Sequence, residues 1–369
     1  MKDDVRFART FLQNLSAQAA GREVPLRRRL VSGTPGTVAV RLAVAAAVLF
    51  GLVWVAYKAQ QDPRTFVIVG LNGLTLAGLY FVVASGFTLI FGLMRVVNMA
   101  HGSLYMLAGF FAFELQERMT GGEAVSAFGS SQASLADWVV PLVVASFAIG
   151  VLGLLMQQVF LRWNQGQELR QALITIAISV IIADQALAHF GGIAQELAPP
   201  SNWPESVQLR IYDITYPFFR LFVLLSAVVI GLALWAVIKR TRFGMIVRAG
   251  VDDRQMVSAL GINVQVVFAI SFFLGALLAG IAGVLGGTMI SVDKANDTQY
   301  LLIALIVVII GGMGSLGGAA LGALALGLVD AYGDVYLPAG YTNYSVLLIF
   351  GLLVLVLAVR PQGLFGRPA

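Results

Sequence analysis

Long apolar stretches are the feature that most restricts how this chain can fold. A helix of about 20 apolar residues crosses the hydrocarbon core of a bilayer. The stretches are continuous rather than alternating, which excludes a transmembrane β-barrel. We therefore expect an all-α fold, a polytopic transmembrane helical bundle of about ten spans. The predicted spans lie near residues 38–57, 66–94, 101–118, 138–161, 169–191, 217–238, 264–290, 299–312, 315–336 and 344–359.

Composition supports this expectation and removes several classes of function. Of the 369 residues, 59% are hydrophobic and only 12% are charged, whereas a soluble domain carries about 25% charged residues. The chain has no Cys and two His, so it has no disulfide, thiolate nucleophile or motif with the spacing of metal ligands. It also lacks a G-x-x-x-x-G-K-[ST] phosphate loop, an H-E-x-x-H motif and a G-x-S-x-G motif. We predict neither a membrane-embedded enzyme nor a cofactor bound by this chain.

The charges of the loops orient the spans. Lys and Arg exceed acids in the first 41 residues and in 239–263, whereas 192–216 and 330–343 are predominantly acidic. Basic loops stay in the cytoplasm, so an even number of spans places both termini there. The apolar run at 38–57 lies too far into the chain and is too long for a signal peptide. The expected organisation is a cytoplasmic tail at 1–37, an additional first span and loop at 38–65, and a transmembrane domain at 66–369.

The basic loop 240–263 contains a candidate short amphipathic helix. Asp252 followed by Gln255 resembles a capping box, and Gly261 is a typical residue just beyond a helix C-terminus. The expected apolar face consists of Met256, Val257 and Leu260. Such a helix either rests on lipid headgroups or docks into a cytoplasmic partner. Asp252 and Asp253 favour the partner, because anionic headgroups repel carboxylates.

Polar or glycine-rich breaks within the apolar region give candidate path residues. In "RVVNMAHGSLYMLAGF", residues 95–110, Asn98 and His101 either pair to lock a turn or line a path through the membrane. The glycines from Gly311 to Gly318 either allow close helix packing or unwind a helix as a hinge. Asp184 is an acid inside a predicted span, which either reaches the interface or has a role in transport.

Two spans resemble one another. Residues 71–87 ("LNGLTLAGLYFVVASGF") and 270–286 ("ISFFLGALLAGIAGVLG") have similar patterns of small and apolar residues. Because these spans are five apart, they run in opposite directions, as in an inverted repeat. Transporters of this kind place broken helices where the repeats meet. We therefore expect an inverted repeat and broken helices.

Several motifs resemble one known family. The segment 71–110 matches the pattern N-G-L-x-x-G…N-F-A-H-G at Asn72, Gly73, Gly78, Tyr80, Gly86, Gly92, Asn98, Ala100, His101 and Gly102. It departs from that pattern at Phe81, Met99 and Ser103. Further matches are "GMIVRAGVDDRQMVSALGINV", "VVIIGGMGSLGGAALGALALGLVD" and the ending "RPQGLFGR". From about Phe66 onward, the sequence resembles the LivH-type permeases of branched-chain amino acid ABC transporters, with their urea, amide and aromatic-acid relatives.

The resemblance implies a permease subunit in the bacterial inner membrane. Its implied partners are a second, LivM-like permease, two ATP-binding subunits that hold ATP and Mg²⁺, and a periplasmic solute-binding protein. The resemblance makes 245–261 a coupling helix at the ATPase interface, with Arg248, Ala249, Asp252, Asp253, Arg254, Met256, Leu260 and Gly261 as its candidate residues. The candidate path or hinge residues are Asn72, Asn98, His101, Gly102, Ser103, Asp184, Gly311, Gly312, Gly314 and Ser315.

One alternative from another class stays open at this point. An ion-coupled secondary transporter of a small organic solute needs no ATP-binding partner. It requires paired ionisable groups within the membrane, and the sequence pattern offers Asp184 as the clearest intramembrane acid. An ATP-driven importer of branched-chain amino acids or a related small polar solute is therefore the favoured prediction.

Overall fold

The structure is a computed structural model, and it describes residues 51, 53–55, 57–94, 97–122, 124, 132–210, 212–252, 254–337 and 344–366. The expected cytoplasmic tail and most of the expected first span lie outside the described residues. Two units are separated at Tyr57, and the fold below is that of the second unit, Lys58–Ala369.

The described helices follow the apolar stretches closely. Six of them are long and apolar enough to cross a membrane, so the chain is a polytopic helical membrane protein. The helices are α3 (Pro63–Met94), α4 (His101–Thr120), α5 (Leu135–Met156) with its continuations η2 (Gln157–Leu161) and η3 (Arg162–Asn164), α6 (Glu168–Phe190), α7 (Phe218–Arg240), α8 (Arg242–Asp252), α9 (Arg254–Ala259), α10 (Val264–Met289), α11 (Asn296–Gly311), α12 (Leu316–Tyr336) and α13 (Ser345–Val359).

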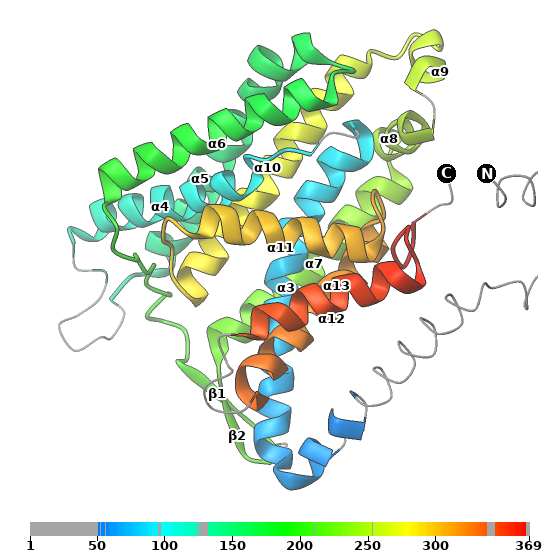
Figure 1. The fold of residues 1–369 in the computed structure, drawn as a ribbon. Coiled ribbons are helices and arrows are strands. Elements are labelled where there is room, and N and C mark those ends of the chain that lie inside the picture. The colour runs from blue at the N-terminus through cyan, green and yellow to red at the C-terminus, as the bar shows by residue number, and fades with distance from the viewer. Residues whose placement is uncertain are drawn as a thin grey trace, which may run out of the picture. The chain divides into compact units, whose positions relative to one another are not determined.

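Helix α3 is the central element, and α7, α10, α11 and α12 pack against it (Figure 1). Small residues make these contacts close. A Cβ atom on Gly86 would lie 2.5 Å from the carbonyl oxygen of Gly275 in α10, and one on Gly73 would lie 3.0 Å from that of Gly327 in α12. In lipid there is no hydrophobic drive between helices, so close backbone packing of this kind holds them together. The glycines of the sequence therefore serve helix crossing at these positions.

The bundle has two ends, which we name by their loops. At the hairpin end, the Arg64 side chain at the start of α3 donates a hydrogen bond to the carbonyl of Asp213, and Tyr332 of α12 donates one to the carbonyl of Phe66. At the basic-loop end, Met94 of α3 packs in one apolar cluster with Val247 of α8. Helices α10 and α12 therefore run antiparallel to α3.

The loop at 192–217 contains the one departure from an all-α fold among the described residues. Strands β1 (Ser206–Leu209) and β2 (Ile214–Pro217) form an antiparallel hairpin, with Ser206 opposite Pro217. Its turn includes Tyr212 at φ 56° and Asp213 at φ 49°. Trp203 packs against Trp138 at the start of α5, with 5.8 Å between the ring centroids. No strands were predicted in this acidic loop.

Candidate functional site

The polar break lies between α3 and α4. His101, the first residue of α4, lies beside Val83 in the middle third of α3 and not beside the end of that helix. The His101 side chain is fully buried, and its Nε2 lies 3.0 Å from the carbonyl oxygen of Val83. Its ring meets that of Phe87 edge-on, with 5.5 Å between centroids. Helix α4 therefore begins inside the bundle and runs only to the hairpin end.

Helix α11 begins at the same place and runs the other way. Its first residue, Asn296, exchanges hydrogen bonds of 3.1 Å with Asp293, which fixes the turn after α10. A Cβ atom on Gly102 in α4 would lie 2.8 Å from the carbonyl carbon of Asp297 and 2.9 Å from the amide nitrogen of Leu301. The two helix N-termini thus touch through their backbones, while α11 ends at the basic-loop end. Each start follows a full-length helix, α3 for α4 and α10 for α11.

The polar side chains of the break do not form the pair that the sequence suggested. The Asn98 carboxamide oxygen accepts from the amide of Ala100 at 3.2 Å, and the Asn98 carbonyl accepts from the amide of His101 at 3.2 Å. Ser103 reaches α6, where its hydroxyl lies 2.8 Å from that of Ser179. Within the described part of the chain, Asn98 Nδ2 and His101 Nδ1 are buried without a hydrogen-bond partner. Hydrogen bonds of Asn98 to the backbone amides of Ala100 and His101 hold the turn, and two buried side-chain nitrogens have no hydrogen-bond partner among the described residues.

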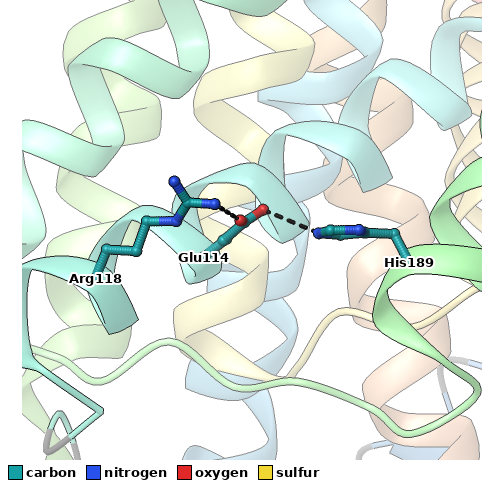
Figure 2. A network of polar contacts seen from close by, with 3 residues as sticks. All are labelled: Glu114, Arg118 and His189. Atoms are coloured by element: carbon teal, nitrogen blue, oxygen red, sulfur yellow. Dashed lines mark hydrogen bonds and ion pairs between the residues drawn. The ribbon is translucent and has the colours of Figure 1, made fainter.

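Asp184 lies apart from this region. It is exposed on α6, within two turns of the end of that helix at Phe190. Nearby, Glu114 of α4 forms ion pairs with Arg118 on its own helix and with His189 of α6, the latter at 3.4 Å, as Figure 2 shows. This network is partly exposed and joins two helices. The geometry fits the interfacial alternative for Asp184 rather than a path.

Asn72 belongs to a closed structural network. Its side-chain oxygen accepts hydrogen bonds from Arg220 Nη1 at 2.6 Å and from the Tyr216 hydroxyl at 3.0 Å. The Tyr216 hydroxyl also lies 3.1 Å from that of Thr75. The network ties the hairpin and the start of α7 to α3. Asn72 therefore holds the hairpin end together and does not face the break at 95–100.

The glycines between α11 and α12 form a tight turn at the basic-loop end. Gly312 has φ 97° and Gly314 has φ 81°, which are conformations that favour glycine. Ser315 caps α12 by accepting from the amide of Gly318. The segment 363–366 closes over this turn, because the amides of Leu364 and Phe365 donate to the carbonyls of Ile310 and Gly311 at 2.8 and 3.0 Å. These glycines therefore connect two separate helices, beside Gly92 near the end of α3, and do not form a break within one helix.

The basic loop contains two helices where one was predicted. Helix α8 ends at Asp252 and α9 begins at Arg254, so Asp252 does not start the helix. Gly261 does terminate it, with φ 79°. In α9, Val257 is buried but Met256 is 59% exposed, and Leu260, just after the helix, is 72% exposed, so the predicted apolar face is divided. Asp253 lies outside the described residues.

Helix α8 joins the basic loop to the glycine turn. Val247 packs against Ile90 of α3 and Phe268 of α10. Half-buried Arg248 lines a cavity of about 80 Å³ together with Gly314, Ser85 and Thr88. Ala249 is exposed. Helix α8 therefore packs against α3 and α10, and the cavity lies between Arg248 and the turn at Gly314.

Comparison with known proteins identifies the family. Residues 69–357 match the family described as "Branched-chain amino acid transport system / permease component". The chain belongs to this family.

Three curated relatives are similar over most of their length. BraD of Pseudomonas aeruginosa, a high-affinity branched-chain amino acid transport system permease protein, is 33% identical, covering 81% of this chain and 95% of BraD. LivH of Escherichia coli K12 is 30% identical, covering 80% and 94%, and LivH of Salmonella typhimurium is 29% identical, covering 80% and 94%. No solved structure was found to match. The predicted family resemblance is confirmed, and the chain is a transport permease rather than an enzyme.

This permease contains an acid in the candidate span α12 for which no role was predicted from the sequence. Asp330 lies in the predicted span 315–336 and was also counted among the acids of the loop at 330–343, and the structure places it in α12, which ends at Tyr336. Its Oδ2 accepts a hydrogen bond of 2.5 Å from the Tyr80 hydroxyl in the middle of α3. No local sequence signal indicates this contact, because Tyr80 lies 250 residues earlier in the chain.

Proposed function

We propose that this permease is a membrane subunit of an ATP-driven importer for branched-chain amino acids or a related small polar solute. The observation that carries the proposal is the family match over 69–357, with BraD and LivH covered almost entirely. The proposed partners are a second, LivM-like permease, two ATP-binding subunits and a periplasmic solute-binding protein. ATP and Mg²⁺ bind to the ATP-binding subunits, because this sequence has no phosphate loop.

The proposed coupling element is the pair α8 and α9. Exposed Leu260 and Met256 present apolar surface at the basic-loop end. Buried Val247 packs α8 against α3, and half-buried Arg248 lines one cavity with Gly314. An ATP-binding subunit that binds α9 would displace α8 when it changes conformation. The displacement of α8 would then shift the turn between α11 and α12. The further proposed members of this interface are Ala249, Asp252, Asp253, Arg254 and Gly261.

The proposed topology has about ten spans, counting α4, α11, α13 and the span outside the described residues, with both termini in the cytoplasm. The basic-loop end then faces the cytoplasm of a bacterial cell, and the membrane is the inner one. An inverted repeat is supported by α3 followed by the shorter α4 and α10 followed by the shorter α11, which run in opposite directions. The proposed path and hinge residues are Asn98, His101, Gly102, Ser103, Gly311, Gly312, Gly314 and Ser315.

Reconstitution with and without partners tests this function. Vesicles that contain this permease, its second permease and the ATP-binding subunits should accumulate leucine when given ATP and the solute-binding protein. Vesicles with this chain alone should accumulate none, because no element of it hydrolyses ATP. An uncoupler should leave uptake unchanged while ATP is present. Accumulation by the chain alone, abolished by the uncoupler, would instead establish the ion-coupled alternative.

A single introduced cysteine tests the coupling element. The chain has no Cys, so Leu260→Cys creates the one thiol of this chain, at an exposed position directly after α9. In the assembled transporter it should form a cross-link to an ATP-binding subunit with a short bifunctional reagent. Leu225→Cys is the matched control, because Leu225 is 61% exposed but lies on α7. Equal cross-linking of both thiols, or of neither, would contradict the assignment of α9.

A further inference from the structure

The Asp330 carboxylate is the centre of an aromatic and acidic cluster that the family match leaves without a role. Tyr80 donates a hydrogen bond to its Oδ2, and the Tyr80 ring lies edge-on to Tyr300 of α11 with 6.4 Å between centroids. Tyr300 in turn stacks on Tyr105 of α4 at 3.9 Å. The cluster therefore joins α3, α4, α11 and α12. Both half-crossing helices contribute to it within about one turn of their starts.

The charge of Asp330 is not balanced within the described part of the chain, where no cation pairs with it. Asp330 is only partly buried, and Asp334, one turn further along α12, is exposed. A carboxylate within a span is costly unless it faces protein, water or a cation. The Asp330 side of α12 is therefore not a lipid-facing surface, and a solute cation could pair with it.

The chemistry of the cluster fits an ammonium group. A carboxylate provides opposite charge and accepts charge-assisted hydrogen bonds. The Tyr80 hydroxyl holds one carboxylate oxygen and leaves the other for the cation. Resting on the proposed function, we propose that Asp330, held by Tyr80, binds the α-ammonium group of an amino acid during its passage. Asp330 contacts the solute, and Tyr80 is a positioning residue.

Thiol labelling tests the site without relying on uptake. In the assembled transporter, Asp334→Cys places a unique thiol one turn from Asp330. A cationic methanethiosulfonate should label it at least fivefold faster than an anionic one, and leucine should slow this labelling. The leucine analogue 4-methylpentanoate, which has no ammonium group, should not. In the double variant Asp334→Cys with Asp330→Asn, both the charge preference and the protection by leucine should disappear.

Uptake kinetics provide the second readout. Asp330→Asn should lower ATP-driven leucine uptake at least tenfold, Asp330→Glu should retain a substantial part of it, and Tyr80→Phe should raise the half-saturating concentration more than it lowers the maximal rate. If the wild-type complex assembles but does not hydrolyse ATP, the proposed function fails, whereas the labelling of the assembled complex still reports on Asp330.

Three results would overturn the inference. Protection by 4-methylpentanoate equal to that by leucine would show that the ammonium group is not recognised. Loss of the second permease from the complex in Asp330→Asn would show that Asp330 pairs with a cation of that subunit instead. An Asp334→Cys thiol that labels equally with both reagents would also contradict the proposal, because it would place no effective negative charge beside the thiol.

Discussion

Cells that produce a Gly102→Leu variant should contain almost no folded permease. The backbone of α11 occupies the space that any side chain at Gly102 would need, with the Asp297 carbonyl carbon 2.8 Å from a Cβ atom. Over-packing against flexible side chains costs about 1–3 kcal/mol, but here the obstacle is backbone at a helix N-terminus, which cannot change rotamer. We expect a cost above that range, measured as the loss of a monodisperse peak when detergent extracts are separated by size.

Gly351→Leu is the matched control for this variant. Gly351 lies within α13, and nothing is found within 4 Å of a Cβ atom there. The control adds the same side chain to a helical glycine, so it should leave the yield of monodisperse protein close to that of the wild type. A Gly102→Leu protein as abundant and as thermally stable as the control would show that α4 and α11 do not meet through their backbones.

Gly312→Val should lower the stability of the permease and abolish uptake, with an effect second only to that of Gly102→Leu. Gly312 has φ 97°, where a β-branched residue is strained. A Cβ atom would also lie 2.9 Å from the Cα of Gly366. Together, the backbone strain and the displacement of segment 363–366 should cost about 2–4 kcal/mol. The measurement is the midpoint of thermal unfolding in detergent together with ATP-driven leucine uptake in vesicles.

Met313→Val provides the control at the neighbouring position. The Met313 side chain is 61% exposed, and its backbone does not have positive φ. This variant should therefore change the unfolding midpoint by only a degree or two. If Gly312→Val unfolds at the same temperature as Met313→Val, the turn between α11 and α12 is not held by the segment that closes over it.

The sequence predicted the helices because their apolar runs end where the structure places loops. The break at 95–100 was recognised from Asn98, His101 and Gly102, and the turn at 312–315 from its glycines. The family motifs were recognised for the same reason, since they fall on these breaks. Local chemistry was sufficient wherever a residue type, such as glycine at positive φ, determines the local backbone.

Features that depend on distant partners could not be predicted. Asn72 looks like a path residue in sequence, and only the fold brings Arg220 and Tyr216 to it. Asp330 had no predicted role because its partner Tyr80 is 250 residues away. The division of the basic loop into α8 and α9 was missed because the packing of Val247 on α3, rather than a sequence signal, stabilises α8.

The meeting of Gly102 with Asp297 has a mechanical consequence. No side chain separates the two backbones, so no side chain can change its rotamer to accommodate a shift of either helix. If α11 tilts, its N-terminus should displace the N-terminus of α4, because the two backbones are in contact. The far end of α11 lies at the basic-loop end and the far end of α4 at the hairpin end, so both ends of the bundle should move at the same time. We therefore expect the hairpin end and the basic-loop end of the bundle to move in opposite senses, one closing as the other opens.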